Sequence, residues 1–226
     1  MIINKASLIF LERKVKEPKI GDGYQEIINY LIRRNKPKII NLLYYDAVGS
    51  LEIDWQHQAI FVKQLKIWTT SFPYSQEQIV SLGTETFETF LLKNFLFSNS
   101  KLLGLHSFLL DKKGEKQCWL MLDFRIKPGP EALRKIKFYV KNMLNLSKIK
   151  GGGFLVQTDR SYHFIGRKII AQEIYKEFLK KIIKSDGGSG LIDIGFCGHA
   201  LTKDLDICLR IQKKKEGKKL KIVARI

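Results

Sequence analysis

The sequence is poor in the residues that form disulfide frameworks and zinc sites. It contains three cysteines, Cys118, Cys197 and Cys208, and none belongs to a CxxC pair. An odd number of cysteines in a chain of this size is typical of free thiols in a reducing compartment. Cys197, His199 and Cys208 match no zinc spacing known to us, and a fourth ligand is missing. We therefore expect buried thiols.

Long apolar runs are also absent. No stretch approaches the roughly 18 consecutive apolar residues of a membrane-spanning helix. Residues 1–14, MIINKASLIFLERK, hold a short apolar run that charge follows at once, which does not fit a secretory signal peptide. Internal repeats and low-complexity tracts are missing as well. We expect a cytoplasmic protein with no membrane partner.

Acidic residues are scarce relative to basic ones. The chain has 22 Asp and Glu against 40 Lys and Arg, which gives a net charge of +18 and a pI near 9.8. Such an excess attracts polyanions, because each phosphate that a cation neutralises releases condensed counterions. The other interpretation is a charge that serves solubility, as on the lysine-rich surface of a heat-adapted protein. We expect nucleic acid, DNA or RNA, as a partner.

What the sequence does contain predicts an α+β fold with a mixed or antiparallel sheet and packed helices. Apolar residues make up 45% of the 226 positions, enough for a sizeable core. Apolar runs predict strands within 51–68 and at 118–124, 154–157, 162–165, 191–194 and 220–224, and a lysine-rich hairpin over 211–221. Helical spacing and end signals predict helices over 23–36, from 75 through 97, over 131–146 and over 167–184.

Two of these helices are well marked. Pro130 stands at the first turn of the helix over 131–146, where its missing N–H costs nothing. The helix over 167–184 is predicted from apolar residues that recur every four positions between Ile170 and Ile182, with lysines on the other faces.

Three segments of the second half carry polar residues in contexts that suit a catalytic site. WLMLDFR is an apolar strand that ends in Asp123. QTDRSYHFIG is a polar corner between short strands, with Ser161 and His163. LIDIGFCGHALTKDLDICLRI places Asp193 after an apolar pair and Arg210 on a later apolar stretch.

The order of these segments resembles the archaeo-eukaryotic primase superfamily, which includes primase-polymerases. That family has an apolar strand ending in Asp-x-Asp or Asp-x-Glu, then Ser-x-His in a hairpin, then an apolar residue followed by Asp, and commonly a later Arg. Ser161-Tyr162-His163, Ile192-Asp193 and Leu209-Arg210-Ile211 match the last three elements over roughly residues 115–212. The resemblance implies a primase-polymerase-like core, with an RRM-like half and a second small sheet.

The resemblance also implies roles for individual residues. Nucleotidyl transfer uses divalent metals, and Mg²⁺ prefers carboxylate and phosphate oxygens. By resemblance, Asp123, His163 and Asp193 are the catalytic residues, and Asp123 and Asp193 hold Mg²⁺ or Mn²⁺. Guanidinium groups pair with phosphates in a bidentate geometry. The residues that would bind a nucleoside triphosphate are then Arg125, Arg160, Ser161, His163, Arg167 and Arg210.

One position departs from the family pattern. The second carboxylate of the first motif should follow two residues after Asp123, and Arg125 stands there. Residues two apart on a strand share a face, so a cation replaces a metal ligand. The chain resembles a reduced, single-Asp member. We expect it to keep nucleotide binding with weak or lost polymerase activity, or to use one metal for different chemistry. Whether it is an enzyme stays open.

Each candidate residue also has a purely structural interpretation. Asp123 would cap the turn before Pro128, His163 would be a hydrogen-bonded core histidine, and Asp193 would be a turn residue. Ser161 and Arg210 would likewise be ordinary turn and surface residues.

Two further functions stay open: a non-catalytic nucleic-acid-binding module, and a nucleotide-binding accessory in defence or replication. LAGLIDADG homing endonucleases, which GLIDIGF resembles, are rejected because only about 30 residues follow and no second copy is present.

Residues 111–226 are predicted to form the primase-like core. Residues 1–110 match no pattern known to us. They are expected to be an α/β part that either contacts a protein partner or belongs to the same domain.

Overall fold

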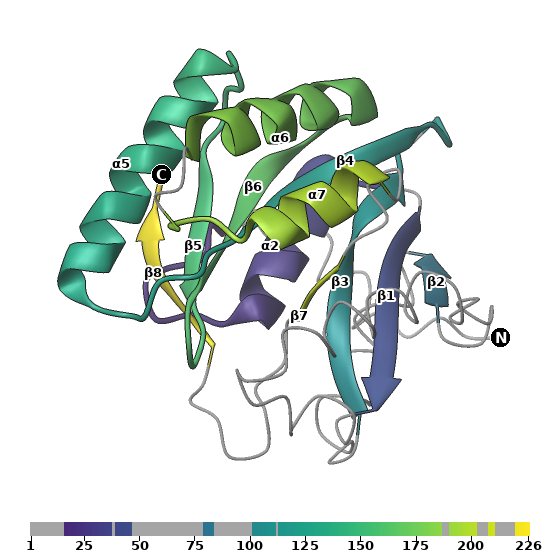
Figure 1. The fold of residues 1–226 in the computed structure, drawn as a ribbon. Coiled ribbons are helices and arrows are strands. Elements are labelled where there is room, and N and C mark those ends of the chain that lie inside the picture. The colour runs from purple at the N-terminus through teal and green to yellow at the C-terminus, as the bar shows by residue number, and fades with distance from the viewer. Residues whose placement is uncertain are drawn as a thin grey trace, which may run out of the picture.

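The computed structural model describes residues 16–37, 39–46, 79–83, 101–111, 113–186, 190–202, 208–210 and 220–226. These residues have the expected α+β architecture (Figure 1). Their helices are α2 (Tyr24–Asn35), α5 (Pro130–Leu146), α6 (Gln172–Asp186) and α7 (Ile194–Thr202). Their strands are β1 (Ile39–Asp46), β2 (Ile79–Gly83), β3 (Lys101–Leu110), β4 (Lys116–Asp123), β5 (Gly153–Gln157), β6 (Tyr162–Ala171), β7 (Cys208–Arg210) and β8 (Lys221–Arg225).

The described strands form one antiparallel sheet in the order β2-β1-β3-β4-β6-β5-β8. One side of β3 pairs with β4 up to Phe108 and Cys118, and then with β7, where Gly104 lies opposite Arg210. β4 and β7 therefore pair with successive parts of the same edge of β3. Strands β1 to β3 continue the sheet of the central strands, because β3 pairs directly with β4.

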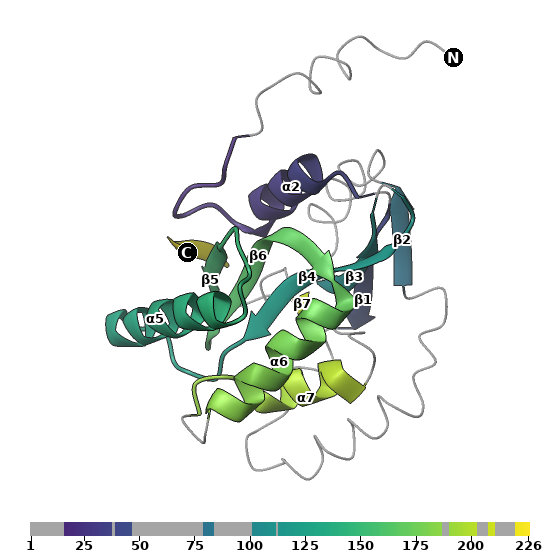
Figure 2. The ribbon, with the colours of Figure 1, turned by 90° about the horizontal axis from the view of Figure 1, so that it is seen from above.

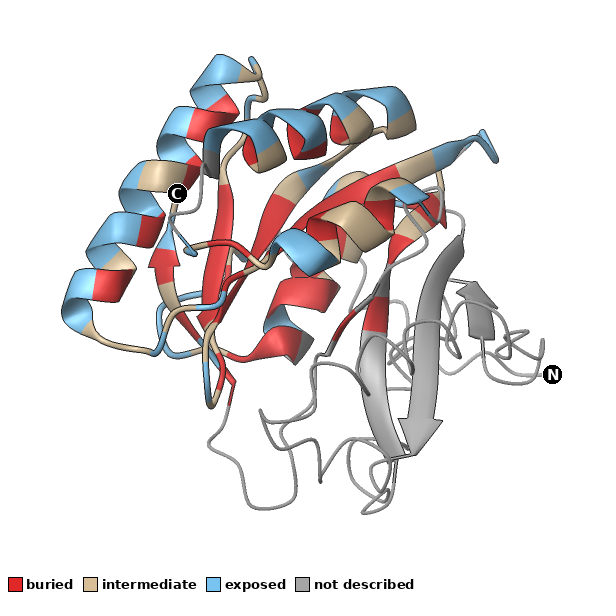
Figure 3. Cartoon of the chain, in the orientation of Figure 1, coloured by how far each residue is buried: buried red, intermediate tan, exposed pale blue. Residues whose placement is uncertain are grey.

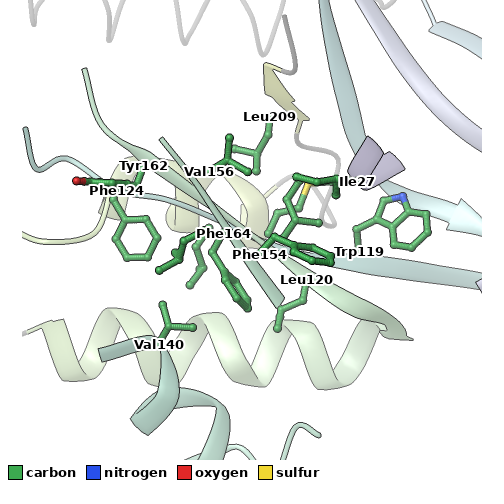
Figure 4. Packing of buried hydrophobic residues seen from close by; sticks show 14 of the residues in the cluster. Ile27, Trp119, Leu120, Phe124, Val140, Phe154, Val156, Tyr162, Phe164 and Leu209 are labelled. Atoms are coloured by element: carbon green, nitrogen blue, oxygen red, sulfur yellow. The ribbon is translucent and has the colours of Figure 1, made fainter. Parts of the chain in front are cut away.

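Helices cover both faces of the sheet. α2 lies on one face, and α5, α6 and α7 lie on the other (Figure 2). The middle strands are consequently buried on both sides, as the continuous apolar run of β4 predicts. Residues Cys118–Leu122 of β4 are at most 1% exposed, and the central strands are the most buried part of the molecule (Figure 3). Figure 4 shows this core, from Ile27 of α2 through Phe154 and Phe164 to Val140 of α5.

α2 forms where the sequence supplies both end signals and an apolar stripe. The Glu26 carboxylate accepts the backbone N–H of Gly23 at 2.9 Å, which satisfies a donor at the helix start. Lys36 ends the helix in a left-handed conformation, with φ of 47°, and Pro37 prevents its continuation. Ile27 and Leu31 of the stripe are at most 1% exposed, so α2 belongs to the core.

α6 is joined to β4 through one buried tyrosine. The Tyr175 hydroxyl donates to the Met121 carbonyl and accepts the Met121 N–H at 3.1 Å. The register between β4 and β6 shifts between Trp119 and Met121, so the phenol satisfies both backbone groups beside this irregularity. Burial raises the pKa of Tyr175 well above its usual 10.0, and the hydrogen bond to Met121 partly offsets that rise.

The glycine run before β5 fits a close backbone contact. Gly152 has a φ of +60°, and a Cβ atom there would lie 1.9 Å from the backbone oxygen of Ile226. A residue without a side chain is needed for both reasons. The run thus permits the N–H and carbonyl of Gly153 to bond with Ile226.

Several predicted elements are confirmed. α5 matches the helix predicted over 131–146, and α2 matches the helix over 23–36 to within one residue at each end. β4, β5 and β8 lie where the apolar runs placed strands. Residues 51–68, 84–97 and 211–219 lie outside the described residues, so the elements predicted there stay predictions.

Two predicted elements are wrong, and a third, the helix over 167–184, begins later than predicted. The helix expected from Arg167 begins only at Gln172, because Ile169 and Ile170 pair with β4 and extend β6. The strand expected over 191–194 is reduced to a single bridge between Ile192 and Phe124, since α7 starts at Ile194. The helix expected from Ser75 does not include Ile79–Gly83, which pairs with β1 as β2.

Candidate functional site

The three polar segments of the second half meet where β4 and β6 carry their site residues. Asp123, the last residue of β4, lies opposite His163 of β6. The Asp193 N–H donates to the Asp123 carbonyl at 3.0 Å, and the Arg125 N–H donates to the Leu191 carbonyl at 3.0 Å. These backbone bonds bring Asp123, Arg125, His163 and Asp193 into one place.

Asp193 has two structural tasks at the start of α7. Its Oδ1 accepts the backbone N–H of Phe196 at 3.0 Å, and its backbone oxygen accepts the N–H of Cys197 at 3.1 Å. This is the geometry of a helix N-cap, where a carboxylate also interacts favourably with the helix dipole. Its Oδ2 forms an ion pair with Nε of Arg125 at 3.2 Å.

Arg125 therefore pairs with a carboxylate that the resemblance assigns to a metal. Its side chain is 48% exposed, whereas that of Asp193 is 21% exposed. The guanidinium thus remains accessible from solvent while one of its nitrogens pairs with Asp193. A half-exposed guanidinium has further donors with which to bind an anion.

His163 is buried between two polar side chains. Its Nδ1 lies 2.5 Å from the Tyr24 hydroxyl, and its Nε2 lies 3.7 Å from Oδ1 of Asp123. The Tyr24 and His163 rings are also in tilted contact, with centroids 6.0 Å apart. The His163 side chain is only 7% exposed. It is held between α2 and the carboxylate at the end of β4.

Tyr24 is a member of this group that the sequence did not single out. It lies 139 residues before His163, at the first position of α2. Its only sequence signal is that a tyrosine with a polar hydroxyl shares the apolar face of α2 with Ile27, Ile28 and Leu31. A buried tyrosine hydroxyl usually finds a hydrogen-bond partner, but the sequence does not say which one.

Ser161 and Arg160 lie in the turn between β5 and β6. The Thr158 N–H donates to the Ser161 carbonyl at 2.9 Å, and the Ser161 N–H donates to Oγ1 of Thr158 at 3.0 Å. The two hydroxyl oxygens are 3.2 Å apart. Arg160 is exposed at the tip of this turn. The turn precedes His163 directly, so both residues lie at the same end of β6 as Asp123.

One predicted phosphate-binding arginine, Arg167, has other partners, and the side chain of another, Arg210, lies outside the described residues. Arg167 lies four residues beyond His163 on β6, about 13 Å along a strand. Its guanidinium pairs with Glu17 at 2.9 Å and stacks on the Phe154 ring at 5.3 Å. Of Arg210 only the backbone is described, opposite Gly104 in the β7–β3 pair. The structure therefore does not bring Arg167 to the site.

One of the two predicted metal ligands, Asp193, is bonded to other groups in the structure. Both oxygens of Asp193 already have partners, the Phe196 N–H and Arg125. Within the described residues, no three His, Cys, Asp or Glu side chains form a group that could hold a metal ion. Mg²⁺ is usually held by one or two carboxylates with phosphates and waters, and a nearby guanidinium opposes a cation. The predicted Mg²⁺ or Mn²⁺ therefore stays a prediction.

A protein-family model matches the segment of the chain that contains Asp123, His163 and Asp193. The model described as archaeo-eukaryotic primase 1D-like, of the AEP-like family, matches residues 82–223, which is more than half of the chain. The protein belongs to the archaeo-eukaryotic primase-like family. Membership confirms the primase-like core that the three polar segments indicated. No curated protein sequence matches the chain. Among the described helices of this primase-like protein, none is long and apolar enough to cross a membrane.

Proposed function

We propose that this primase-like protein binds a nucleoside triphosphate and nucleic acid at the ends of β4 and β6, and that it polymerises weakly or not at all. The ion pair between Arg125 and Asp193 carries the proposal. The Arg125 guanidinium takes the place that a metal ligand has in the family. The site therefore presents a positively charged side chain where a divalent ion would otherwise bind.

The charges around the site support binding of a triphosphate. Arg125 and Arg160 are both exposed, Arg125 in its ion pair with Asp193 and Arg160 in the turn that precedes His163. A bound phosphate would compete with Asp193 for the Arg125 guanidinium, and guanidinium binds phosphate in a bidentate manner. Asp193 would keep its bond to the Phe196 N–H, so α7 would remain capped.

The same arrangement opposes primer extension. Transfer to a primer hydroxyl by a two-metal mechanism needs ions that stabilise both the attacking and the leaving oxygen. Only Asp123 and Asp193 offer carboxylates at family positions, and Arg125 is paired with one of them. A site of this kind binds a triphosphate but does not activate a primer hydroxyl.

The test compares Arg125→Asp with Lys127→Asp, an equal change of charge two residues away on an exposed lysine. We expect Arg125→Asp to lose about ten- to hundredfold in triphosphate affinity, as for loss of a charged hydrogen bond. It should gain affinity for Mn²⁺, because a third carboxylate replaces a cation. Lys127→Asp should do neither. Triphosphate and Mn²⁺ binding are measured separately by calorimetry.

Primer extension with Mg²⁺ or Mn²⁺ completes the test. Robust extension by the wild type would contradict the proposal of weak or lost synthesis. Triphosphate affinity that is unchanged in Arg125→Asp would remove Arg125 from the site. His163→Ala tests the predicted role of His163 in the same binding assay.

The alternative is a nucleic-acid-binding module that uses the primase-like fold as a scaffold. The burial of His163 and its contacts with Tyr24 and Asp123 favour this alternative, since a buried imidazole is not presented to a ligand. Nucleic-acid binding without measurable triphosphate binding would select it.

A further inference from the structure

The outer face of α5 carries a largely exposed aromatic side chain, Phe138. Phe138 is 70% exposed, and it is the only aromatic residue among the large exposed apolar side chains of the described residues. The buried side of α5 consists of Ala132, Ile136, Val140, Met143 and Leu144, so the helix is already anchored without it. The outer face of α5 is exposed along its length (Figure 3).

α6 does not cover this face. It contacts α5 through Tyr139, whose hydroxyl lies 3.1 Å from Oγ of Ser185, and through Lys181, which donates to the Leu146 carbonyl at 3.3 Å. Successive residues on a helix are about 100° apart, so Phe138 points well away from the Tyr139 side. The phenyl ring projects into solvent beyond the helix pair.

The helix neighbours of Phe138 are cations and an amide. Positions three and four residues away on a helix lie beside one another. For Phe138 these are Arg134, Lys135, Lys141 and Asn142, and all four are exposed. Lys135 forms an ion pair with Glu131 at 2.8 Å, and the charge of Arg134 also contributes to lowering the pKa of that carboxyl. An exposed aromatic ring is thus surrounded by positive charge and hydrogen-bond donors.

We propose that this face of α5, centred on Phe138, binds single-stranded nucleic acid, with a base stacked on the ring and phosphates paired with Arg134 and Lys141. The proposal rests on the proposed function and names where its nucleic acid lies. Aromatic rings flanked by cations are how proteins bind single strands without sequence preference. A neutral apolar partner would not require the surrounding cations, whereas a polyanion is complementary to them.

The position of α5 links this surface to the site. α5 begins at Pro130, seven residues after Asp123, and the preceding Gly129 bonds with the Tyr162 hydroxyl of β6. Phe138 lies eight residues into the helix, about 12 Å from its start. A single-stranded nucleic acid that stacks a base on Phe138 and runs along α5 toward the N-terminus of the helix therefore approaches Arg125 and Asp123.

The experiment measures the affinity of labelled single-stranded DNA and RNA oligonucleotides by fluorescence anisotropy. Phe138→Ala should weaken binding about ten- to hundredfold, the range expected for loss of one stacked base. Phe138→Trp should retain it. Leu146→Ala is the matched control, because Leu146 is 66% exposed on the same helix and should change affinity less than twofold. Arg134→Gln and Lys141→Gln should each lower the salt dependence.

Other outcomes separate this inference from the proposed function. A blunt duplex should bind Phe138→Ala and wild type equally, since its bases are not available for stacking. If wild type binds single strands and Phe138→Ala binds them equally well, the α5 inference fails and the proposed function stands. If wild type binds no oligonucleotide at low salt, both fail. If Phe138→Ala and Leu146→Ala abolish self-association in sedimentation, the face is a protein interface and the inference is overturned.

Discussion

At the scale of single residues, the site depends on side chains with more than one partner. Asp193 caps α7 with one oxygen and pairs with Arg125 through the other. His163 contacts Tyr24 on one ring nitrogen and faces Asp123 with the other. A change at any of these residues consequently alters both the local fold and the charge that a ligand meets.

We expect Tyr24→Phe to destabilise the protein by about 1–3 kcal/mol, because the buried Nδ1 of His163 loses its hydroxyl partner. Tyr30→Phe is the matched control on the same helix. The Tyr30 hydroxyl accepts a 2.8 Å hydrogen bond from the exposed Arg34, so its loss should cost less than about 1 kcal/mol. Urea unfolding of the two variants measures the difference. Equal losses of unfolding free energy would show that the Tyr24–His163 hydrogen bond stabilises the fold no more than the Tyr30–Arg34 hydrogen bond does.

The sequence was sufficient to predict the polar residues of the site in the second half, but not the residues that contact them from other parts of the chain. Asp123, His163 and Asp193 stand in recognisable local patterns, and the backbone bonds between their segments bring them together. Tyr24 is joined to them only through tertiary contact, which no local pattern encodes. The pairing of Arg167 with Glu17 escaped prediction for the same reason.

At the scale of elements, the junction of α6 with β4 depends on Tyr175. Its folded-state pKa is raised by burial, so the neutral phenol is favoured in the folded protein. The unfolded chain releases the proton near the usual pKa of 10.0, and the folded chain releases it only at higher pH. The stability that this group contributes is complete below pH 10 and is lost as the pH rises above it.

We therefore expect the free energy of unfolding to fall more steeply above pH 10 in the wild type than in Tyr175→Phe. The variant should be less stable at neutral pH by about 1–3 kcal/mol, since both backbone groups of Met121 lose a buried partner. Urea unfolding between pH 7 and pH 11 checks both statements, and the lysines titrate alike in both proteins. Parallel pH profiles would contradict the role of Tyr175 ionisation.

Element boundaries were predictable where local signals agreed with the sheet. Pro130 and the Pro37 stop mark α5 and α2, and both helices formed there. The four-residue spacing from Ile170 to Ile182 favoured a helix throughout, yet pairing with β4 kept residues up to Ala171 extended. α7 was missed because its two glycines lower helix propensity, and its start depends on the cap at Asp193.

At the scale of the whole molecule, the net charge of +18 predicts affinity for nucleic acid that depends strongly on salt. We expect the affinity for single-stranded oligonucleotides to fall at least tenfold between 50 and 200 mM salt, in line with release of condensed counterions. Filter binding at several salt concentrations measures the slope. Polyglutamate is the control polyanion, and equal binding of it would show a general attraction to negative charge.

The arrangement of α2 has a consequence for how the family boundary is understood. The matched segment begins at residue 82, whereas α2 ends at Asn35. Yet α2 covers one face of the sheet (Figure 2), with Tyr30 packed edge-on against Phe154 at 5.6 Å and Asn35 bonded to the backbone of Arg167 and Ile169. A fragment that begins at residue 82 would lack α2. The face of β5 and β6 that α2 covers would then be exposed to water and would favour association with other molecules. The core of this protein therefore includes a helix, α2, that lies outside the segment matched by the family model.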